Sequence, residues 1–307
     1  MILNPFKKNR IAEFLPKIRG KYTYDVPMKK YTRLAVGGNA EVLFEPEDAK
    51  DLEFFIRTKP RNLPIFVLGG GSNVLVRDGG IIGVVLKLSS PSFKKHELNG
   101  NLLTCGAGLN NANLLRIMCD SLLGGLEFLC TIPGTIGGAM RTNASCFGFS
   151  ISDYWESAQI MDRNGDIKEL YREDFNTEYR DGMFPDDWII LNVTFRMENS
   201  AKHIIKGKIK EYQAYKKANQ PCDKRTAGSF FKNPDGLMAW ELVKKAGCDR
   251  LKHGGAEVSA MHNNFIINKG GATASDIEIL GDEIIQKVKE KTSIVLEPRI
   301  KKVGVKK

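Results

Sequence analysis

The chain has 307 residues, of which 42% are hydrophobic and 27% are charged, and its formal net charge is +10. This composition is typical of a soluble globular protein and argues against disordered and fibrous chains. The lysines and arginines are spread along the chain without the concentrated basic stripe that nucleic-acid binding requires, so we expect no nucleic-acid partner and favour anionic small molecules, phosphates especially.

Membrane spans, export and metal binding are not indicated either. No run of about 18 apolar residues occurs, and the N-terminal residues lack a continuous apolar segment followed by a small-residue cleavage site. The six cysteines are scattered, with no CxxC pair and no histidine at metal-ligand spacing. We therefore expect a cytoplasmic protein with reduced thiols, no membrane partner and no metal site.

The first half of the chain alternates strands and helices. Residues 1–30 predict a short helix at IAEFLPKI, interrupted by Pro16, and a connector. Next come the strand AEVLFEP, the helix EDAKDLEFFIRTK, the strand PIFVLGG and the β-rich run GGGSNVLVRDGGIIGVVLKL. The stretch NNANLLRIMCDSL has helical spacing and precedes a second glycine-rich segment, GGLEFLCTIPGTIGGAMRTNASCFG. A hairpin at Asn164 and Gly165 and the strand WIILNVTFRM follow.

After Met197 the composition changes to a charged helix, SAKHIIKGKIKEYQAYKKANQ, which ends near Pro221. Beyond it we expect the helix GLMAWELVKKAG, the strand NNFIINKG, the amphipathic helix TASDIEILGDEIIQKVKEKT and the strand SIVLEPRIKKVG. Thr273 and Asp276 have the spacing of a capping box at the start of the amphipathic helix. The sequence thus predicts an N-terminal helix and connector over 1–30, one domain over 31–200 and a second over 201–307.

Two glycine-rich loops are the chemically informative feature. Successive N–H groups in a loop without Cβ atoms can turn towards one anion, and glycine lets a diphosphate approach the main chain closely. The loop LGGGSNVL has Val74 where the dinucleotide fingerprint GxGxxG needs glycine, and no GxxxxGK[ST] motif occurs. One such loop alone is typical of a tight turn and does not by itself indicate a phosphate site. Two loops, each beside small polar side chains such as Ser72 and Thr135, favour a phosphate site.

Seven segments, in order from about residue 30 to the C-terminus, resemble one family. They are TRLAVGGNAEVLFEP, VLGGGSNVLVRDGGIIGVVLKL, GLEFLCTIPGTIGGAMRTNASCFG, YRDGMF, AGSFFKNP, GGAEVSAMHNNFIINKGGAT and LEPRI. Together they resemble the UDP-N-acetylenolpyruvoylglucosamine reductases, flavoenzymes of peptidoglycan precursor synthesis, in the shorter form that lacks a substrate-covering insertion. The resemblance implies an α+β fold with a two-lobed FAD-binding domain of the vanillyl-alcohol-oxidase (PCMH) type and a C-terminal α+β substrate-binding domain.

The same resemblance implies the ligands. FAD would be the cofactor, NADPH the co-substrate and UDP-N-acetylglucosamine enolpyruvate the substrate, which is reduced to UDP-N-acetylmuramate by a cytoplasmic monomer. The residues that the resemblance assigns to FAD are Gly69, Gly70, Gly71, Ser72 and Asn73 in the first loop and Gly134, Thr135, Gly137, Gly138 and Asn143 in the second.

Three residues match the family's catalytic groups: Arg180 in YRDGMF, Ser229 in AGSFFKNP and Glu297 in LEPRI. Hydride addition to the enolpyruvyl double bond pushes charge into the substrate carboxylate, which a fixed guanidinium such as that of Arg180 would stabilise. Ser229 would then give a proton to the α-carbon. Glu297 beside this charge would have to be protonated, or would have to orient a donor such as a water or Arg180.

Other residues have weaker assignments. A serine is a poor acid, and Lys232 is a candidate neighbour for its alkoxide, although the resemblance assigns Lys232, Asn233 and Tyr179 to substrate contacts. We assign His262 no role. The chain departs from the family pattern at Cys130, Thr131, Arg141, Gly182 and Arg299. We expect these departures to bear on flavin contacts and a local ion pair more than on the reaction.

Two alternatives stay open from the sequence. One is another FAD-dependent oxidoreductase of the same superfamily, such as a hydroxy-acid or lactone oxidase. Those oxidases often tether FAD through a histidine or cysteine near the first loop, and this chain has no histidine before His96. The other alternative is a non-catalytic, basic nucleotide-binding protein.

Overall fold

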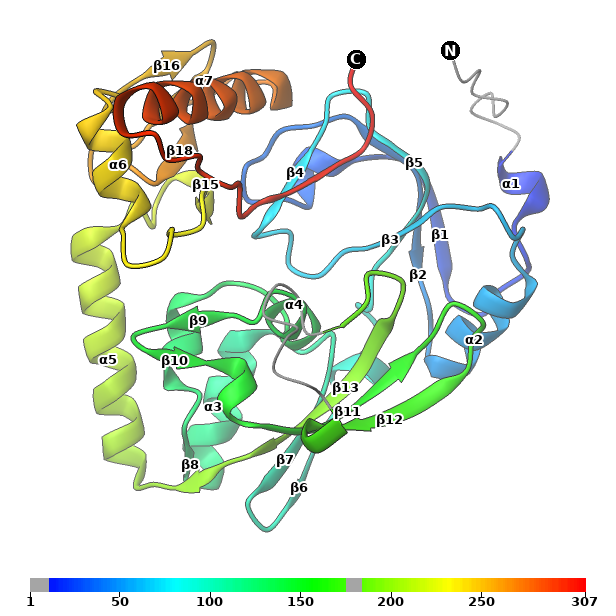
Figure 1. Ribbon diagram of the computed structural model, residues 1–307. Coiled ribbons are helices and arrows are strands. Elements are labelled where there is room, and N and C mark those ends of the chain that lie inside the picture. The colour runs from blue at the N-terminus through cyan, green and yellow to red at the C-terminus, as the bar shows by residue number, and fades with distance from the viewer. Residues whose placement is uncertain (1–10, 175–183) are drawn as a thin grey trace. The chain divides into compact units, whose positions relative to one another are not determined.

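The structure is a computed structural model that describes residues 11–174 and 184–307 (Figure 1). The chain forms two compact units, each assembled from separate segments. Unit 1 comprises Met1–Thr23, Val42–Gly70 and Gly83–Ala214, and unit 2 comprises Tyr24–Glu41, Gly71–Ile82 and Tyr215–Lys307. No helix in the described part of the chain has the length and apolar character needed to cross a membrane.

A five-stranded antiparallel sheet lies in unit 1. Its strands lie in the order β12 (Ile167–Tyr171), β11 (Trp155–Met161), β13 (Ile189–Arg196), β7 (Leu102–Gly106) and β6 (His96–Asn99). The hairpin predicted at Asn164 and Gly165 joins β11 to β12, with Met161 opposite Ile167. Gly165 has a φ of +87°, which explains the glycine in this turn.

Helices α1 (Ile11–Phe14), α2 (Ala49–Thr58), α3 (Asn111–Ser121) and α4 (Ile136–Arg141) also belong to unit 1. Helix α1 ends before Pro16, because the residue that precedes a proline disfavours helical geometry. The side chain of Asp48 caps α2, and that of Asn110 caps α3. Helix α4 packs against β7 and β13, which places the second glycine-rich loop beside this sheet.

A second sheet has the order β1 (Lys21–Pro27), β2 (Asn39–Glu45), β5 (Ile81–Leu86) and β3 (Ile65–Val67). Within unit 1, β3 runs parallel to β5, with Ile65 opposite Val84 and Val67 opposite Leu86. The core nearby contains Phe44 and Phe55, whose ring centroids lie 4.5 Å apart. Strand β3 leads directly into the first glycine-rich loop.

Unit 2 is built on an antiparallel sheet of order β15 (Arg225–Ser229), β18 (Phe265–Asn268), β17 (Ala256–Val258) and β16 (Lys252–His253). Helix α7 (Ala274–Thr292) contacts β16, β17 and β18, and α6 (Ala239–Lys245) packs beside α7 (Figure 1). The capping box predicted at Thr273 and Asp276 starts α7. The predicted C-terminal strand is shorter than expected, because its continuous strand is β19 (Lys301–Val303), which pairs in parallel with β4 (Val74–Val76).

The remaining elements are short, apart from α5 (Lys202–Asn219). They are β8 (Leu123–Gly124), β9 (Ser145–Cys146), β10 (Phe149–Ser150) and β14 (Glu198–Asn199), and the 3-10 turns η1 (Met28–Lys30), η2 (Pro91–Lys94), η3 (Glu127–Thr131), η4 (Ile151–Asp153) and η5 (Arg172–Asp174).

The compact units differ from the predicted domain boundaries in two places. Unit 2 includes the early segments Tyr24–Glu41 and Gly71–Ile82, and the later boundary falls within α5 rather than at about residue 200. The reason is long-range packing: β4 pairs with the C-terminal strand β19, and Leu34 and Leu75 lie in the same core as α7.

Candidate functional site

The two glycine-rich segments of unit 1 pack main chain against main chain. A Cβ added at Gly70 would lie 2.6 Å from Gly134 Cα, and one added at Gly69 would lie 3.0 Å from Thr135 Oγ1. Because the first contact is with backbone, no side chain fits at Gly70 unless the two segments separate. The predicted loops are therefore brought together, and glycine makes their approach possible.

Several N–H groups of these segments have no acceptor in the described part of the chain. Ile136 N–H donates to Leu109 O at 2.9 Å, and Gly137 N–H donates to Ala107 O at the same distance. Over the described ranges, however, no residue accepts a hydrogen bond from the N–H of the four loop residues Gly69, Gly70, Gly134 and Thr135. Adjacent loops with unpaired main-chain donors bind anions, so the residues present fit the diphosphate of a dinucleotide cofactor.

Three further predicted cofactor residues have internal partners. A Cβ at Gly137 would lie 2.9 Å from that of Ala107, and Gly138 N–H donates to Thr135 Oγ1 at 3.3 Å. Asn143 has a φ of +41°, and its side-chain oxygen accepts from Ser152 N–H at 3.3 Å. These residues shape the second loop, and their contact with a cofactor stays a prediction.

The rest of the first loop belongs to unit 2. Gly71 has a φ of +63°, and a Cβ there would lie 1.9 Å from Tyr31 O. Asn73 accepts from Lys301 N–H at 3.0 Å and donates its side-chain N–H to Arg299 O at 3.3 Å. This contact of Arg299 is made by its main-chain carbonyl group and so does not depend on which side chain stands at this position. Ser72 is half-buried.

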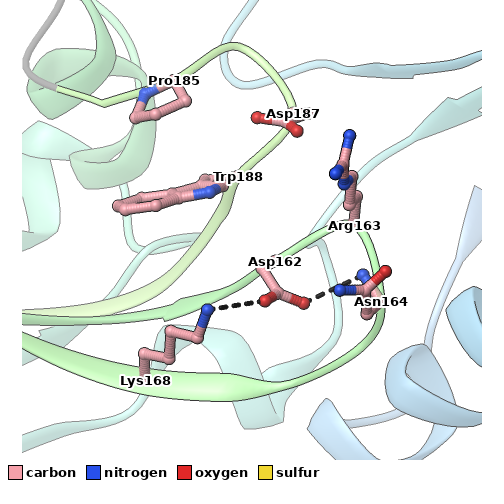
Figure 2. A pocket seen from close by; sticks show the side chains of 7 residues that line it. All are labelled: Asp162, Arg163, Asn164, Lys168, Pro185, Asp187 and Trp188. Atoms are coloured by element: carbon pink, nitrogen blue, oxygen red, sulfur yellow. Dashed lines mark hydrogen bonds and ion pairs between the residues drawn. The ribbon is translucent and has the colours of Figure 1, made fainter.

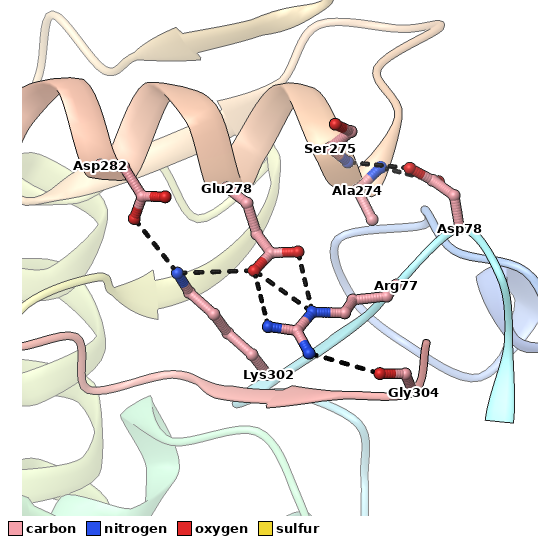
Figure 3. A network of polar contacts seen from close by, with 8 residues as sticks. All are labelled: Arg77, Asp78, Ala274, Ser275, Glu278, Asp282, Lys302 and Gly304. Carbon is pink, nitrogen blue, oxygen red and sulfur yellow. Dashed lines mark hydrogen bonds and ion pairs between the residues drawn. The ribbon is translucent and has the colours of Figure 1, made fainter. Parts of the chain in front are cut away.

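A polar network fixes the strand that follows this loop (Figure 3). Arg77 Nε donates to Glu278 Oε2 at 3.0 Å, and Lys302 Nζ lies 3.6 Å from Glu278 Oε1. Burial alone would raise the pKa of Glu278, but the hydrogen bonds from Arg77 and the charge of Lys302 outweigh it and lower this pKa. Asp78 accepts from the first N–H groups of α7, those of Ala274 and Ser275.

Ser229 ends β15 directly after a bulge. The register shifts between Thr226 and Ser229, where Gly228 adopts a φ of +82°, and Ser229 lies opposite Phe265 of β18. A bulge of this kind re-aims the side chains that follow it. The Ser229 side chain is half-buried, and none of the residues that the structure describes forms a hydrogen bond with its hydroxyl.

Glu297 and Lys232 are brought together within unit 2. Lys232 Nζ lies 3.3 Å from Glu297 Oε2, and Lys232 N–H donates to Glu297 O at 2.8 Å. Phe231 and Pro298 form an antiparallel bridge between the same two segments. The structure thus gives Glu297 a cationic partner, Lys232, that the sequence analysis did not consider.

Asn233 has a structural contact that the sequence did not predict. Its side-chain oxygen accepts from Ala239 N–H at 3.0 Å, at the start of α6, and its side-chain nitrogen lies 3.4 Å from the sulfur of Met238. The predicted residues Tyr179, Arg180 and Gly182 lie outside the described residues.

Arg141, one of the departures from the family pattern, has a clear structural role. Its guanidinium donates to Phe184 O at 2.8 Å and also to the carbonyl oxygens of Pro185 and Trp188. Burial lowers the pKa of Arg141. Two other residues that depart from the family pattern, Thr131 and Cys130, also have partners in unit 1. Thr131 Oγ1 donates to Phe128 O, and the Cys130 thiol contacts Ile209 O.

A cavity of about 400 Å³ in unit 1 contains none of the predicted site residues (Figure 2). It is lined by Asp162, Arg163, Asn164, Lys168, Pro185, Asp187 and Trp188. The buried Asp162 carboxylate accepts from Asn164 N–H at 2.9 Å and from Lys168 Nζ at 2.8 Å, so its charge serves the hairpin turn. The predicted residues of the glycine loops and of the Ser229 segment are not among those that line it. Over the described ranges no group of three or more potential metal ligands occurs.

Comparison with known proteins identifies the family of both parts of the chain. A model of the UDP-N-acetylenolpyruvoylglucosamine reductase C-terminal domain matches residues 220–303, and an FAD binding domain model matches residues 40–171. The UDP-N-acetylenolpyruvoylglucosamine reductase of Paramagnetospirillum magneticum is 41% identical over 293 residues, 95% of each chain. The enzyme of the same name from a Bradyrhizobium species is 42% identical over 292 residues, again 95% of each chain.

A solved structure gives the same result. The crystal structure of UDP-N-acetylenolpyruvylglucosamine reductase from Thermus caldophilus matches with a TM-score of 0.79 and 30% identity, covering 94% of this chain and 100% of that one. The expected α+β fold with an FAD-binding domain and a C-terminal domain is confirmed, and a non-catalytic nucleotide-binding protein is excluded. The chain belongs to the UDP-N-acetylenolpyruvoylglucosamine reductase family and is an FAD-binding oxidoreductase.

Proposed function

We propose that the protein reduces UDP-N-acetylglucosamine enolpyruvate to UDP-N-acetylmuramate, with NADPH as reductant, as a cytoplasmic monomer in peptidoglycan precursor synthesis. The observation that carries the proposal is the similarity to named reductases along 95% of the chain. The family models match residues 40–171 and 220–303, which include the glycine loops and the AGSFFKNP and LEPRI segments. Residues 31–200 would hold FAD and residues 201–307 the substrate, with Ser72 and Asn73 as cofactor residues that belong to unit 2.

FAD, when bound, supplies a two-electron carrier between NADPH and the enolpyruvyl double bond. The task of this chain is to hold the diphosphate. The donors for this task are the N–H groups of Gly69, Gly70, Gly134 and Thr135, which have no acceptor among the residues that the structure describes. Hydrogen bonds to a charged acceptor contribute about 1.5–3 kcal/mol each, so each of these donors would add to the binding of the diphosphate.

Ser229 would complete the reduction. Once hydride has reached the β-carbon, the former π electron pair lies on the α-carbon and the substrate carboxylate. The α-carbon takes the Ser229 hydroxyl proton to form a C–H bond, and solvent reprotonates the alkoxide. A hydroxyl with no partner among the described residues can turn towards the substrate, which supports this role.

Charge balance supports a role for the Lys232–Glu297 pair. A lone carboxylate would repel the negative charge that develops on the substrate, whereas the ammonium 3.3 Å away offsets it. Arg180, in the proposal, stabilises the substrate carboxylate through paired guanidinium donors. Tyr179, Lys232 and Asn233 stay proposed substrate contacts.

The proposal is tested by turnover in air with purified protein, NADPH and UDP-N-acetylglucosamine enolpyruvate. We expect NADPH consumption to require the sugar nucleotide and to yield UDP-N-acetylmuramate in equal amount, as measured by chromatography. Equal NADPH consumption without the sugar nucleotide, with oxygen as the acceptor, would instead favour the oxidase alternative.

A further inference from the structure

One buried asparagine holds the segment that follows Ser229. Asn264, which is 4% exposed, immediately precedes β18. Its side-chain oxygen accepts from Phe231 N–H at 2.9 Å, and its side-chain nitrogen donates to Phe231 O at 3.0 Å. Its main-chain oxygen accepts from Phe230 N–H at 2.7 Å. Three hydrogen bonds from a single residue therefore fix the two residues after Ser229.

These bonds replace a strand ladder that ends at Ser229. The bulge at Gly228 shifts the register of β15 against β18, and the chain then turns away to pair with the segment of Glu297. Phe231 is 1% exposed, so its main-chain N–H and C=O need partners inside the protein. The side-chain amide of Asn264 supplies one acceptor and one donor, and it pairs with the N–H and C=O of Phe231 as the main chain of a neighbouring strand would.

Asn264 is itself held by His262. The Nδ1 atom of His262 accepts from Asn264 N–H at 3.2 Å, and Phe265 N–H donates to His262 O at 3.0 Å. The imidazole ring packs edge-on against Phe265, with centroids 4.8 Å apart. An acceptor at Nδ1 requires a neutral ring, and burial lowers the pKa of His262, which agrees with that state.

We propose that Asn264 is a positioning residue for proton transfer in this enzyme. Through Phe230 it fixes the main chain next to Ser229, and through Phe231 it fixes the residue next to Lys232, whose ammonium pairs with Glu297. Loss of the amide releases both groups at once. This inference rests on the proposed role of Ser229, and it adds a residue that acts only through others.

The test is a double-mutant cycle on the FAD-loaded enzyme. Flavin is first reduced by NADPH, and its reoxidation by saturating UDP-N-acetylglucosamine enolpyruvate is then followed without oxygen. We expect Asn264→Ala to slow reoxidation on the order of ten- to a hundredfold, as small displacements of catalytic groups do, while the NADPH step and FAD content stay unchanged. In the Ser229→Ala background, Asn264→Ala should cause much less slowing, because only the Lys232–Glu297 pair is left to be displaced.

Asn268 provides a matched control. It is also a buried asparagine, at the other end of β18. Its side-chain nitrogen donates to Leu34 O, and its side-chain oxygen accepts from Gly270 N–H, each at 2.9 Å. Asn268→Ala should remove a comparable number of hydrogen bonds yet leave reoxidation near the wild-type rate. If Asn264→Ala does not fold, Asn264→Asp keeps the volume and the acceptor but loses the donor, and it should slow the same step.

The outcomes separate this proposal from the proposed function. Equal slowing by Asn264→Ala with and without Ser229, or equal slowing of both half-reactions, overturns the positioning role while leaving the reductase assignment intact. Normal reoxidation in Ser229→Ala removes Ser229 from the mechanism and this inference with it. Failure of the wild-type enzyme to be reoxidised by the substrate contradicts the proposed function itself.

Discussion

Replacing Gly70 with alanine should weaken FAD binding by forcing the two glycine segments apart. The new methyl group would lie 2.6 Å from Gly134 Cα, whereas unbonded carbon atoms settle about 3.5–4.0 Å apart, so the segments must separate by about 1 Å. Such a shift misaligns at least one N–H with the diphosphate. Loss of one hydrogen bond to a charged group costs about 1.5–3 kcal/mol, which raises the FAD dissociation constant about ten- to a hundredfold.

The assay is titration of apoprotein with FAD, followed by quenching of flavin fluorescence. Gly207→Ala in α5 is the control, because a Cβ there meets nothing within 4 Å and alanine is the better helix former by about 0.8–1.0 kcal/mol. It should leave FAD affinity unchanged. Wild-type affinity in Gly70→Ala would refute the placement of the diphosphate between Gly70 and Gly134.

Three further predictions follow from the same structure. Ser229→Ala should retain FAD and its reduction by NADPH but lose reoxidation by substrate by orders of magnitude; rapid mixing measures both steps, and near-normal turnover would contradict the assignment. Arg141→Met should cost about 1–3 kcal/mol in unfolding free energy because it removes the guanidinium donor from the carbonyl oxygens of Phe184, Pro185 and Trp188, and chemical denaturation that gave the wild-type value would count against this. The folded-state pKa of Glu278 is lowered. The ionised carboxylate therefore contributes its full stabilisation of the fold above pH 4.5, the ordinary pKa, and this contribution is lost as pH falls through the folded pKa. Glu278→Gln should flatten the acid side of the stability–pH curve, and an unchanged acid slope would argue against the Arg77–Glu278 pair.

Local features of the fold were predictable from the sequence. The hairpin at Asn164 and Gly165 and the capping box at Thr273 and Asp276 are set by residues a few positions apart, and each was confirmed. Helices α2 and α3 likewise follow from their periodicity and their capping residues. Patterns of this range are what sequence periodicity can detect.

Long-range pairing was not predictable in this way. Nothing near Gly71 in the sequence indicates that its loop continues into a strand that pairs with β19, so the units differ from the predicted domains. The ion pair of Lys232 with Glu297 was missed for the same reason. Asn264 did carry a signal, because an asparagine beside an apolar strand must find hydrogen-bond partners when buried, yet the sequence does not identify Phe231 as that partner.

The central claim is that substrate, rather than oxygen, accepts the electrons. The most direct measurement is an anaerobic stopped-flow experiment in which one equivalent of NADPH bleaches the flavin absorbance and UDP-N-acetylglucosamine enolpyruvate is then added. We predict rapid return of the absorbance, with one UDP-N-acetylmuramate formed per flavin. An absorbance that stays bleached until oxygen is admitted would contradict the proposed function.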